Sequence, residues 1–170
     1  MKQLIVILLL TITPIFIFSQ NKSSESINWL DLSQAEVLAS KHNKNMLLFF
    51  YRPECEYCDK MKNNTLTNSS VINLINENFF PVMINGKSKD PITYNDTTYV
   101  NDKSNPEDEP SIHNIVKKLV DMKDGNYYWP TIVLVNGKHQ KIIQGNGAWS
   151  KEQTLRNLKQ IISVREPIKN

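Results

Sequence analysis

Four short runs rich in apolar residues stand out along the chain, and polar turn residues bound each of them. Their length and their aromatic and β-branched content predict strands over 46–51, 79–84, 132–135 and 140–143. The polar turn Asn43-Lys44-Asn45 precedes the first run, and Asn136-Gly137 predicts an antiparallel hairpin between the last two. Because Pro81 has no N–H donor, we expect it near the start or at the edge of its strand.

Amphipathic stretches separate the predicted strands. Apolar residues recur there at helical spacing, which predicts helices over 33–42, 68–78, 111–122 and 150–162. Ser33 with Glu36, and Ser150 with Gln153, have the spacing of capping boxes at the first and last of these helices. The order helix, strand, helix, strand in the first half predicts a parallel strand–helix–strand unit.

The stretch 86–110 interrupts this alternation. Within it, 92–94 and 97–100 flank Asn95-Asp96, a pattern that predicts a small β-hairpin. We expect this insertion to lie on the surface of the domain. The charged residues 102–110 that follow are most simply a solvated loop.

The amino terminus has the pattern of an export signal. Lys2 precedes an apolar stretch over 4–18, which is short for a membrane span, and polar residues follow from Ser19. A cleaved signal is therefore favoured over an uncleaved anchor, with export to the periplasm or secretion from the cell. We expect a signal peptide over 1–20, a flexible leader over 21–26 and one domain over 27–165.

Composition is that of an ordinary globular protein. The chain has 170 residues, of which 40% are hydrophobic and 22% are charged, enough for one domain with a proper core. The formal net charge of +3 gives no indication of nucleic-acid binding.

The candidate chemistry lies in Cys55-Glu56-Tyr57-Cys58, which holds the only two cysteines of the chain. The pair follows the first predicted strand and precedes a segment compatible with a helix. Backbone N–H groups left free at a helix start, and the positive end of the helix dipole, stabilise a thiolate. An oxidising compartment permits disulfides, but this spacing closes too small a loop to staple a whole domain. Redox chemistry accounts for the pair better.

These features, in this order, resemble the thioredoxin fold: the strand into the cysteine pair, Trp129-Pro130-Thr131 opening a strand, the Asn136-Gly137 hairpin and a closing helix. The chain is similar, more narrowly, to exported bacterial thioredoxin family proteins in Trp29-Leu30, Asn43-Lys44, Met46-Leu47-Leu48, Cys55–Met61 and Asn78-Phe79-Phe80-Pro81-Val82. The resemblance covers about 28–164. It implies an α/β fold, a thioredoxin-like three-layer α/β/α sandwich with a mixed central sheet. The β-hairpin insertion would come before the helix that precedes a cis-Pro130.

The resemblance also implies roles for the site residues. Cys55 is expected to be the nucleophile, and Cys58 to resolve the mixed disulfide that it forms. The residues expected to contact the substrate are Tyr57, Trp129, Pro130 and Thr131. No metal and no cofactor beyond the Cys55–Cys58 disulfide are expected. The expected partners are protein substrates with disulfides or thiols and a membrane or periplasmic thiol electron donor. We expect a monomer.

Charged neighbours of Cys55 bear on the direction of exchange. Glu54 and Glu56 flank it, and a carboxylate at about 6 Å in water costs a thiolate roughly 0.7 kcal/mol, which Arg52 would partly offset. An unusually acidic thiol is therefore not indicated. The prediction is a thiol–disulfide oxidoreductase of the cell envelope that acts as a reductase rather than an oxidase. Phe49 stands where thioredoxin has a buried aspartate, so proton transfer from Cys58 must use another group or water.

Two other functions remain open on the sequence. A Cu(I)-binding metallochaperone of the same fold is one, because thiolates prefer Cu(I). A non-catalytic protein-binding module with an idle disulfide is the other. His42, His113 and His139 show no paired ligand spacing and are predicted at the surface or in turns. They therefore do not complete a tetrahedral zinc site with the cysteine pair.

Overall fold

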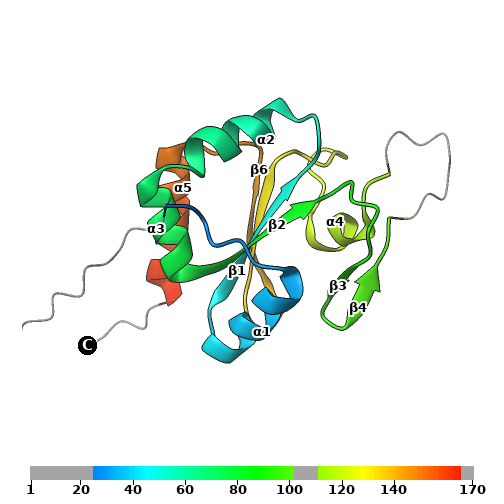
Figure 1. The fold of residues 1–170 in the computed structure, drawn as a ribbon, viewed down its shortest axis with the longest axis horizontal. Coiled ribbons are helices and arrows are strands. Elements are labelled where there is room, and N and C mark those ends of the chain that lie inside the picture. Colours follow the sequence, from blue (N-terminus) through cyan, green and yellow to red (C-terminus); the bar gives the residue numbers. More distant parts are fainter. Residues whose placement is uncertain (1–24, 102–110, 166–170) are drawn as a thin grey trace, which may run out of the picture.

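A four-stranded mixed sheet divides the protein into two helical layers (Figure 1). The computed structural model describes residues 25–101 and 111–165. The strands of the sheet are β1 (Asn45–Tyr51), β2 (Phe79–Asn85), β5 (Thr131–Val135) and β6 (Lys141–Asn146). They lie in the order β2-β1-β5-β6, with β1 parallel to β2 and antiparallel to β5. The predicted signal peptide, most of the predicted leader and the charged stretch 102–110 lie outside the described residues.

Helices cover both faces of the sheet. One face carries the π-helical turn η1 (Met61–Thr65), α3 (Ser69–Asn78) and α5 (Lys151–Arg165), and the short helix α2 (Glu56–Lys60) leads directly into η1. The other face carries α1 (Leu32–His42), α4 (Asn114–Leu119) and the hairpin of β3 (Ile92–Tyr94) and β4 (Thr97–Tyr99). This arrangement confirms the predicted three-layer α/β/α sandwich with a mixed sheet. No helix in the two described ranges is long and apolar enough to cross a membrane.

Strand β1 is the centre of both hydrophobic cores. Its side chains alternate between the faces, so that Leu48 and Phe50 pack toward α1 and α4 while Leu47 and Phe49 pack toward α3 and α5. All four are at most 1% exposed. At about 1.5–3 kcal/mol for each large apolar side chain that is buried, this one strand supplies a large share of the favourable free energy of folding.

Several predicted boundaries were wrong, and polar residues account for most of the errors. β1 begins at Asn45, which is only 6% exposed and lies in the strand rather than in the turn before it. Asp31 is the N-cap residue of α1, so Ser33 and Glu36 do not form the predicted capping box. Glu36 instead accepts a hydrogen bond from the backbone N–H of Asn95 in the hairpin, at 2.7 Å.

The helix predicted over 111–122 is shorter than the apolar pattern indicated. The Nδ1 atom of His113 accepts a hydrogen bond from the backbone N–H of Ile115 and starts α4 at Asn114. The backbone becomes extended at Val120 and ends the helix there. His113 is fully buried, which corrects its predicted place at the surface, and its Nε2 atom lies 3.1 Å from the carbonyl oxygen of Asp90. One imidazole therefore ties α4 to the insertion.

Two helix starts follow the sequence pattern. The Ser150 Oγ accepts from the Gln153 N–H at 3.2 Å, and the Gln153 side chain accepts from the Ser150 N–H at 2.9 Å. This reciprocal pair caps α5. Asn68 caps α3 through its side-chain oxygen, which accepts from the Ser70 N–H at 3.1 Å.

The hairpin insertion lies at the surface but is anchored in the domain through Tyr94, while Thr93, Thr97 and Thr98 are exposed. Asn95 and Asp96 form its turn, both with positive φ angles of 48° and 58°. Tyr94 is only 2% exposed and joins the core beneath α1 and α4. Its ring meets the ring of His139 edge-on at 5.1 Å. Burial, followed by the nearby charge of Glu36, raises the pKa of Tyr94 to about 12 from an ordinary value of 10.0.

Replacing Tyr94 by Phe should make the free energy of unfolding fall less steeply as the pH rises above 10. The folded protein holds the Tyr94 proton more tightly than the unfolded chain does, so this stabilisation is complete below pH 10 and is lost toward pH 12. The full loss is about 3 kcal/mol. At neutral pH the exchange should cost little, because the Tyr94 hydroxyl has no hydrogen-bond partner within the described structure. Urea unfolding of the wild type and of Tyr94→Phe across this pH range gives the slope of the free energy of unfolding against pH for each protein. Equal slopes would contradict the prediction.

Candidate redox site

The cysteine pair sits where the central strand turns into a helix. β1 ends at Tyr51, and Glu54 then takes a left-handed backbone conformation with φ 53°. This sharp turn places Cys55 as the extended N-cap residue of α2. The Cys55 Sγ accepts a hydrogen bond from the backbone N–H of Cys58 at 3.2 Å. A sulfur held in this way is positioned to be stabilised as a thiolate.

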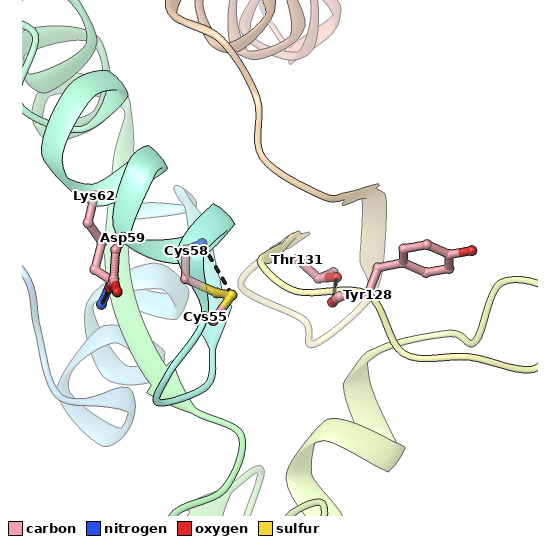
Figure 2. Close-up of a disulfide and its surroundings, with 6 residues drawn as sticks. All are labelled: Cys55, Cys58, Asp59, Lys62, Tyr128 and Thr131. Atoms are coloured by element: carbon pink, nitrogen blue, oxygen red, sulfur yellow. Dashed lines mark hydrogen bonds and ion pairs between the residues drawn. A yellow bond between two sulfur atoms is a disulfide. The ribbon is translucent and has the colours of Figure 1, made fainter.

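Cys55 and Cys58 form a disulfide with 5.2 Å between their Cα atoms (Figure 2). Cys58 is fully buried, whereas Cys55 is 5% exposed. The difference is small, but of the two residues only Cys55 has any exposed surface. The structure therefore makes Cys55 the more accessible of the two cysteines.

The loop before β5 faces the disulfide. Figure 2 shows the start of β5 across from Cys55, with the Tyr128 ring pointing away from the sulfurs. The Trp129–Pro130 peptide bond is cis, and the Pro130 carbonyl oxygen accepts from the Gly147 N–H at 2.8 Å. The Thr131 Oγ1 donates to the Tyr128 carbonyl oxygen at 2.6 Å. These bonds hold the loop in one shape beside the pair.

The residues predicted to contact a substrate differ in how accessible they are. Tyr57 is 64% exposed, whereas Thr131 is fully buried and presents no surface to a substrate. Trp129 is half-buried, and its indole lies against Gly86 so closely that a Cβ atom there would overlap the ring. Sequence reasoning did not single out Tyr128, which is 40% exposed. Three aromatic residues in a row give no periodicity from which to tell which of them faces outward.

Charged side chains near the pair are mostly exposed. Glu54 and Glu56 are exposed, and Asp59 pairs with Lys62 at 2.9 Å. The Arg52 Nε atom is buried and has no hydrogen-bond partner within the described structure. The carboxylates on either side of Cys55 therefore stand without a salt bridge among the described residues, and the predicted offset by Arg52 is not made through an ion pair.

Aromatic packing occupies the position of the buried aspartate of thioredoxin. Phe49 is fully buried, and its ring centroid lies 6.2 Å from that of Trp29 and 6.4 Å from that of Tyr51. The Lys62 Nζ lies 4.6 Å from the centre of the Tyr51 ring. Across residues 25–101 and 111–165, no group of three or more His, Cys, Asp or Glu side chains could hold a metal ion.

Solved structures with this fold include several redox proteins. A thioredoxin from Thermus thermophilus superposes with a TM-score of 0.55 at 18% identity, over 81% of this chain and 88% of that one. A DsbH oxidoreductase gives 0.56 at 14% identity, over 86% and 92%. A disulphide isomerase from Xylella fastidiosa gives 0.52 at 17% identity, over 82% and 99%. At these identities the likeness establishes the fold alone.

Sequence comparison places the chain in a family. An uncharacterized protein of Archaeoglobus fulgidus is 27% identical over 90 residues, which are 52% of this chain and 69% of that protein. The family model described as a thioredoxin-like domain matches residues 32–162, which include the cysteine pair and the Trp129-Pro130-Thr131 loop. The chain therefore belongs to the family of thioredoxin-like domains and carries the Cys-x-x-Cys redox centre of a thiol–disulfide oxidoreductase.

Proposed function

We propose that the protein exchanges disulfides with protein substrates in the cell envelope and works as a reductase rather than as an oxidant. The observation that carries this proposal is the Cys55–Cys58 disulfide at the start of α2, with Cys55 as the residue of the pair that retains some exposure. The pattern of Lys2 followed by an apolar stretch supports export to the periplasm or beyond the cell.

The reaction starts from the reduced pair. The Cys55 thiolate attacks one sulfur of a substrate disulfide, a mixed disulfide forms, and the displaced substrate sulfur leaves as a thiolate that takes up a proton. Cys58 then loses its proton and attacks the Cys55 sulfur. This second step releases the other substrate thiol and forms the Cys55–Cys58 disulfide. Two electrons pass to the substrate, and a thiol donor in the membrane or periplasm returns two electrons to the pair.

The surroundings of the pair supply groups that support the attack by Cys55. The Cys58 N–H that donates to the Cys55 Sγ in the disulfide can hold the thiolate in the same place after reduction. The exposed Tyr57 ring lies beside Cys55 and offers a flat surface to an incoming chain. In the loop across from the pair, Trp129 keeps part of its surface exposed, whereas Pro130 and Thr131 are buried. Phe49 cannot take a proton from Cys58, so that proton leaves through water or another group.

The direction of exchange follows from the charges beside Cys55. Strong oxidants owe their high potential to a stabilised reduced form, in which the nucleophilic cysteine is a thiolate. Glu54 and Glu56 oppose a negative charge on Cys55. They weaken the reduced form relative to the disulfide and so favour a low reduction potential, as a reductase requires.

The first test is catalysis of disulfide reduction. The purified protein should accelerate the reduction of the disulfides of insulin by dithiothreitol, and Cys55→Ser should abolish the acceleration because the attacking sulfur is gone. Cys58→Ser should instead accumulate a covalent mixed disulfide that mass spectrometry detects and excess dithiothreitol releases. Tyr57→Ala keeps both sulfurs and should retain the intramolecular chemistry while slowing turnover of the protein substrate. Activity that survives Cys55→Ser would overturn the assignment.

The second test is the reduction potential of the pair. Equilibration with glutathione should give a value near about −270 mV, as in thioredoxin, and far from the approximately −120 mV of a strong oxidant. Glu54→Gln and Glu56→Gln should each raise the potential by about 15 mV at a pH where Cys55 is ionised, because each removes roughly 0.7 kcal/mol of repulsion. Glu77→Gln, an exposed change on α3, is the matched control. A wild-type potential near that of the strong oxidant would reverse the proposed direction.

A further inference from the structure

A cavity lies between the C-terminal part of α5 and the edge strand β6. Its volume is about 790 Å³, within the range of about 300–1,000 Å³ typical of small-molecule sites. Asn43 and Asn45 line one end of it, at the start of β1, whereas Cys55 follows the other end of that strand. Figure 1 shows α5 on the face of the sheet that α3 also covers. The cavity is therefore separate from the redox pair.

Amide side chains with unused hydrogen-bonding groups line this cavity. Asn43, Asn45, Asn157 and Gln160 all face it, and none of their side chains hydrogen-bonds to another described residue. Asn45 carries the most weight, because it is only 6% exposed. No amide atom of these four residues is among the buried atoms without a partner in the described structure, so the amide groups reach the open space of the cavity. A ligand there can therefore hydrogen-bond to them directly.

An aromatic ring forms part of the same wall. Trp149 lines the cavity and lies directly on Gly145 of β6, where a Cβ atom would overlap the indole. Two hydrogen bonds to η1 hold the backbone of Trp149. The Trp149 N–H donates to the Met61 Sδ at 3.4 Å, and its carbonyl oxygen accepts from the Thr65 Oγ1 at 2.9 Å. The ring is thus held in place beside the free amides.

The lining carries no formal charge. Its remaining amides are already engaged: Asn136 accepts from the backbone N–H groups of Lys138 and Gln140, and Gln144 holds the backbone of Asp121 through both of its amide atoms. A charged ligand would lose its hydration here without gaining a counter-charge, which is unfavourable. The free amides both donate and accept hydrogen bonds. They suit a neutral molecule rich in hydroxyl groups.

We propose that this cavity is a binding site for a neutral saccharide of one or two rings. Sugar hydroxyls match the donors and acceptors of Asn43, Asn45, Asn157 and Gln160, and the apolar C–H face of a pyranose matches the Trp149 ring. Asn45 is the anchor, because it is the least exposed of these four residues. The binding needs neither cysteine, and it is independent of the direction of disulfide exchange.

The test is a titration of the full chain, isotopically labelled and oxidised, with cellobiose and with N,N′-diacetylchitobiose at millimolar concentrations. Nuclear magnetic resonance should show saturable shifts of the Trp149 indole signal and of the side-chain amides of Asn45 and Asn157. Asn157 and Gln160 lie at the surface of α5, so Asn157→Ala and Gln160→Ala should leave the fold intact. Each substitution should weaken binding about fivefold. Asn45→Leu should abolish it. Lys159→Ala, on the same helix but outside the lining, should bind like the wild type.

Three outcomes would overturn the proposal. One is that neither disaccharide shifts the signals of the cavity. Another is equal binding by the wild type and the α5 variants. The third is that a capped neutral tripeptide shifts the same signals while the sugars do not, which would assign the cavity to a peptide. If Asn45→Leu fails to fold, Asn157→Ala and Gln160→Ala decide the question.

Discussion

The pairing of β1 with β5 is the constraint on which the redox site depends. Its register sets Phe50 opposite Thr131, one residue before the end of β1 and at the very start of β5. The segment that leads to Cys55 and the segment that carries Pro130 therefore emerge from the same end of adjacent strands. Because side chains alternate along a strand, a slip of one residue would send the buried face of β1 to the wrong core. The same packing that fixes this register thus fixes the distance between the cysteine pair and its facing loop.

Two tryptophan–glycine contacts hold the segments near the end of the sheet where the redox site lies. Trp129 lies against Gly86, and Gly86 donates its N–H to the Tyr51 carbonyl oxygen at 2.8 Å, at the last residue of β1. Trp149 lies on Gly145 in β6 and bonds to η1. In each case the missing side chain of a glycine lets a large ring approach the backbone. The loops beside the redox site are therefore set by ring packing against the sheet, which leaves Tyr57 and Tyr128 as the more exposed aromatic residues.

Most of the fold could be predicted because its core strands are short, apolar and bounded by turns. Phe49 and Phe50 leave no doubt about burial, and two cysteines three residues apart at a strand end indicate redox chemistry on their own. The misses have one physical origin. Residues far away in the chain cover Asn45, His113 and Tyr94, and hydropathy cannot show which polar residues the fold will bury. The sequence likewise could not show that Trp129 turns inward, because its docking place exists only once β2 has positioned Gly86.

The two candidate sites are joined through Trp149. Its ring belongs to the amide-lined cavity, while its backbone bonds to Met61 and Thr65 in the helical turn that directly follows the Cys55–Cys58 helix. A molecule in the cavity can shift the redox helix only if it binds more tightly to one position of this tryptophan than to another. The indole packs directly on Gly145, in the space that a side chain would take, and this contact restricts its position. The close packing that shapes the cavity therefore also limits communication between the sites, and each can be tested as an independent unit.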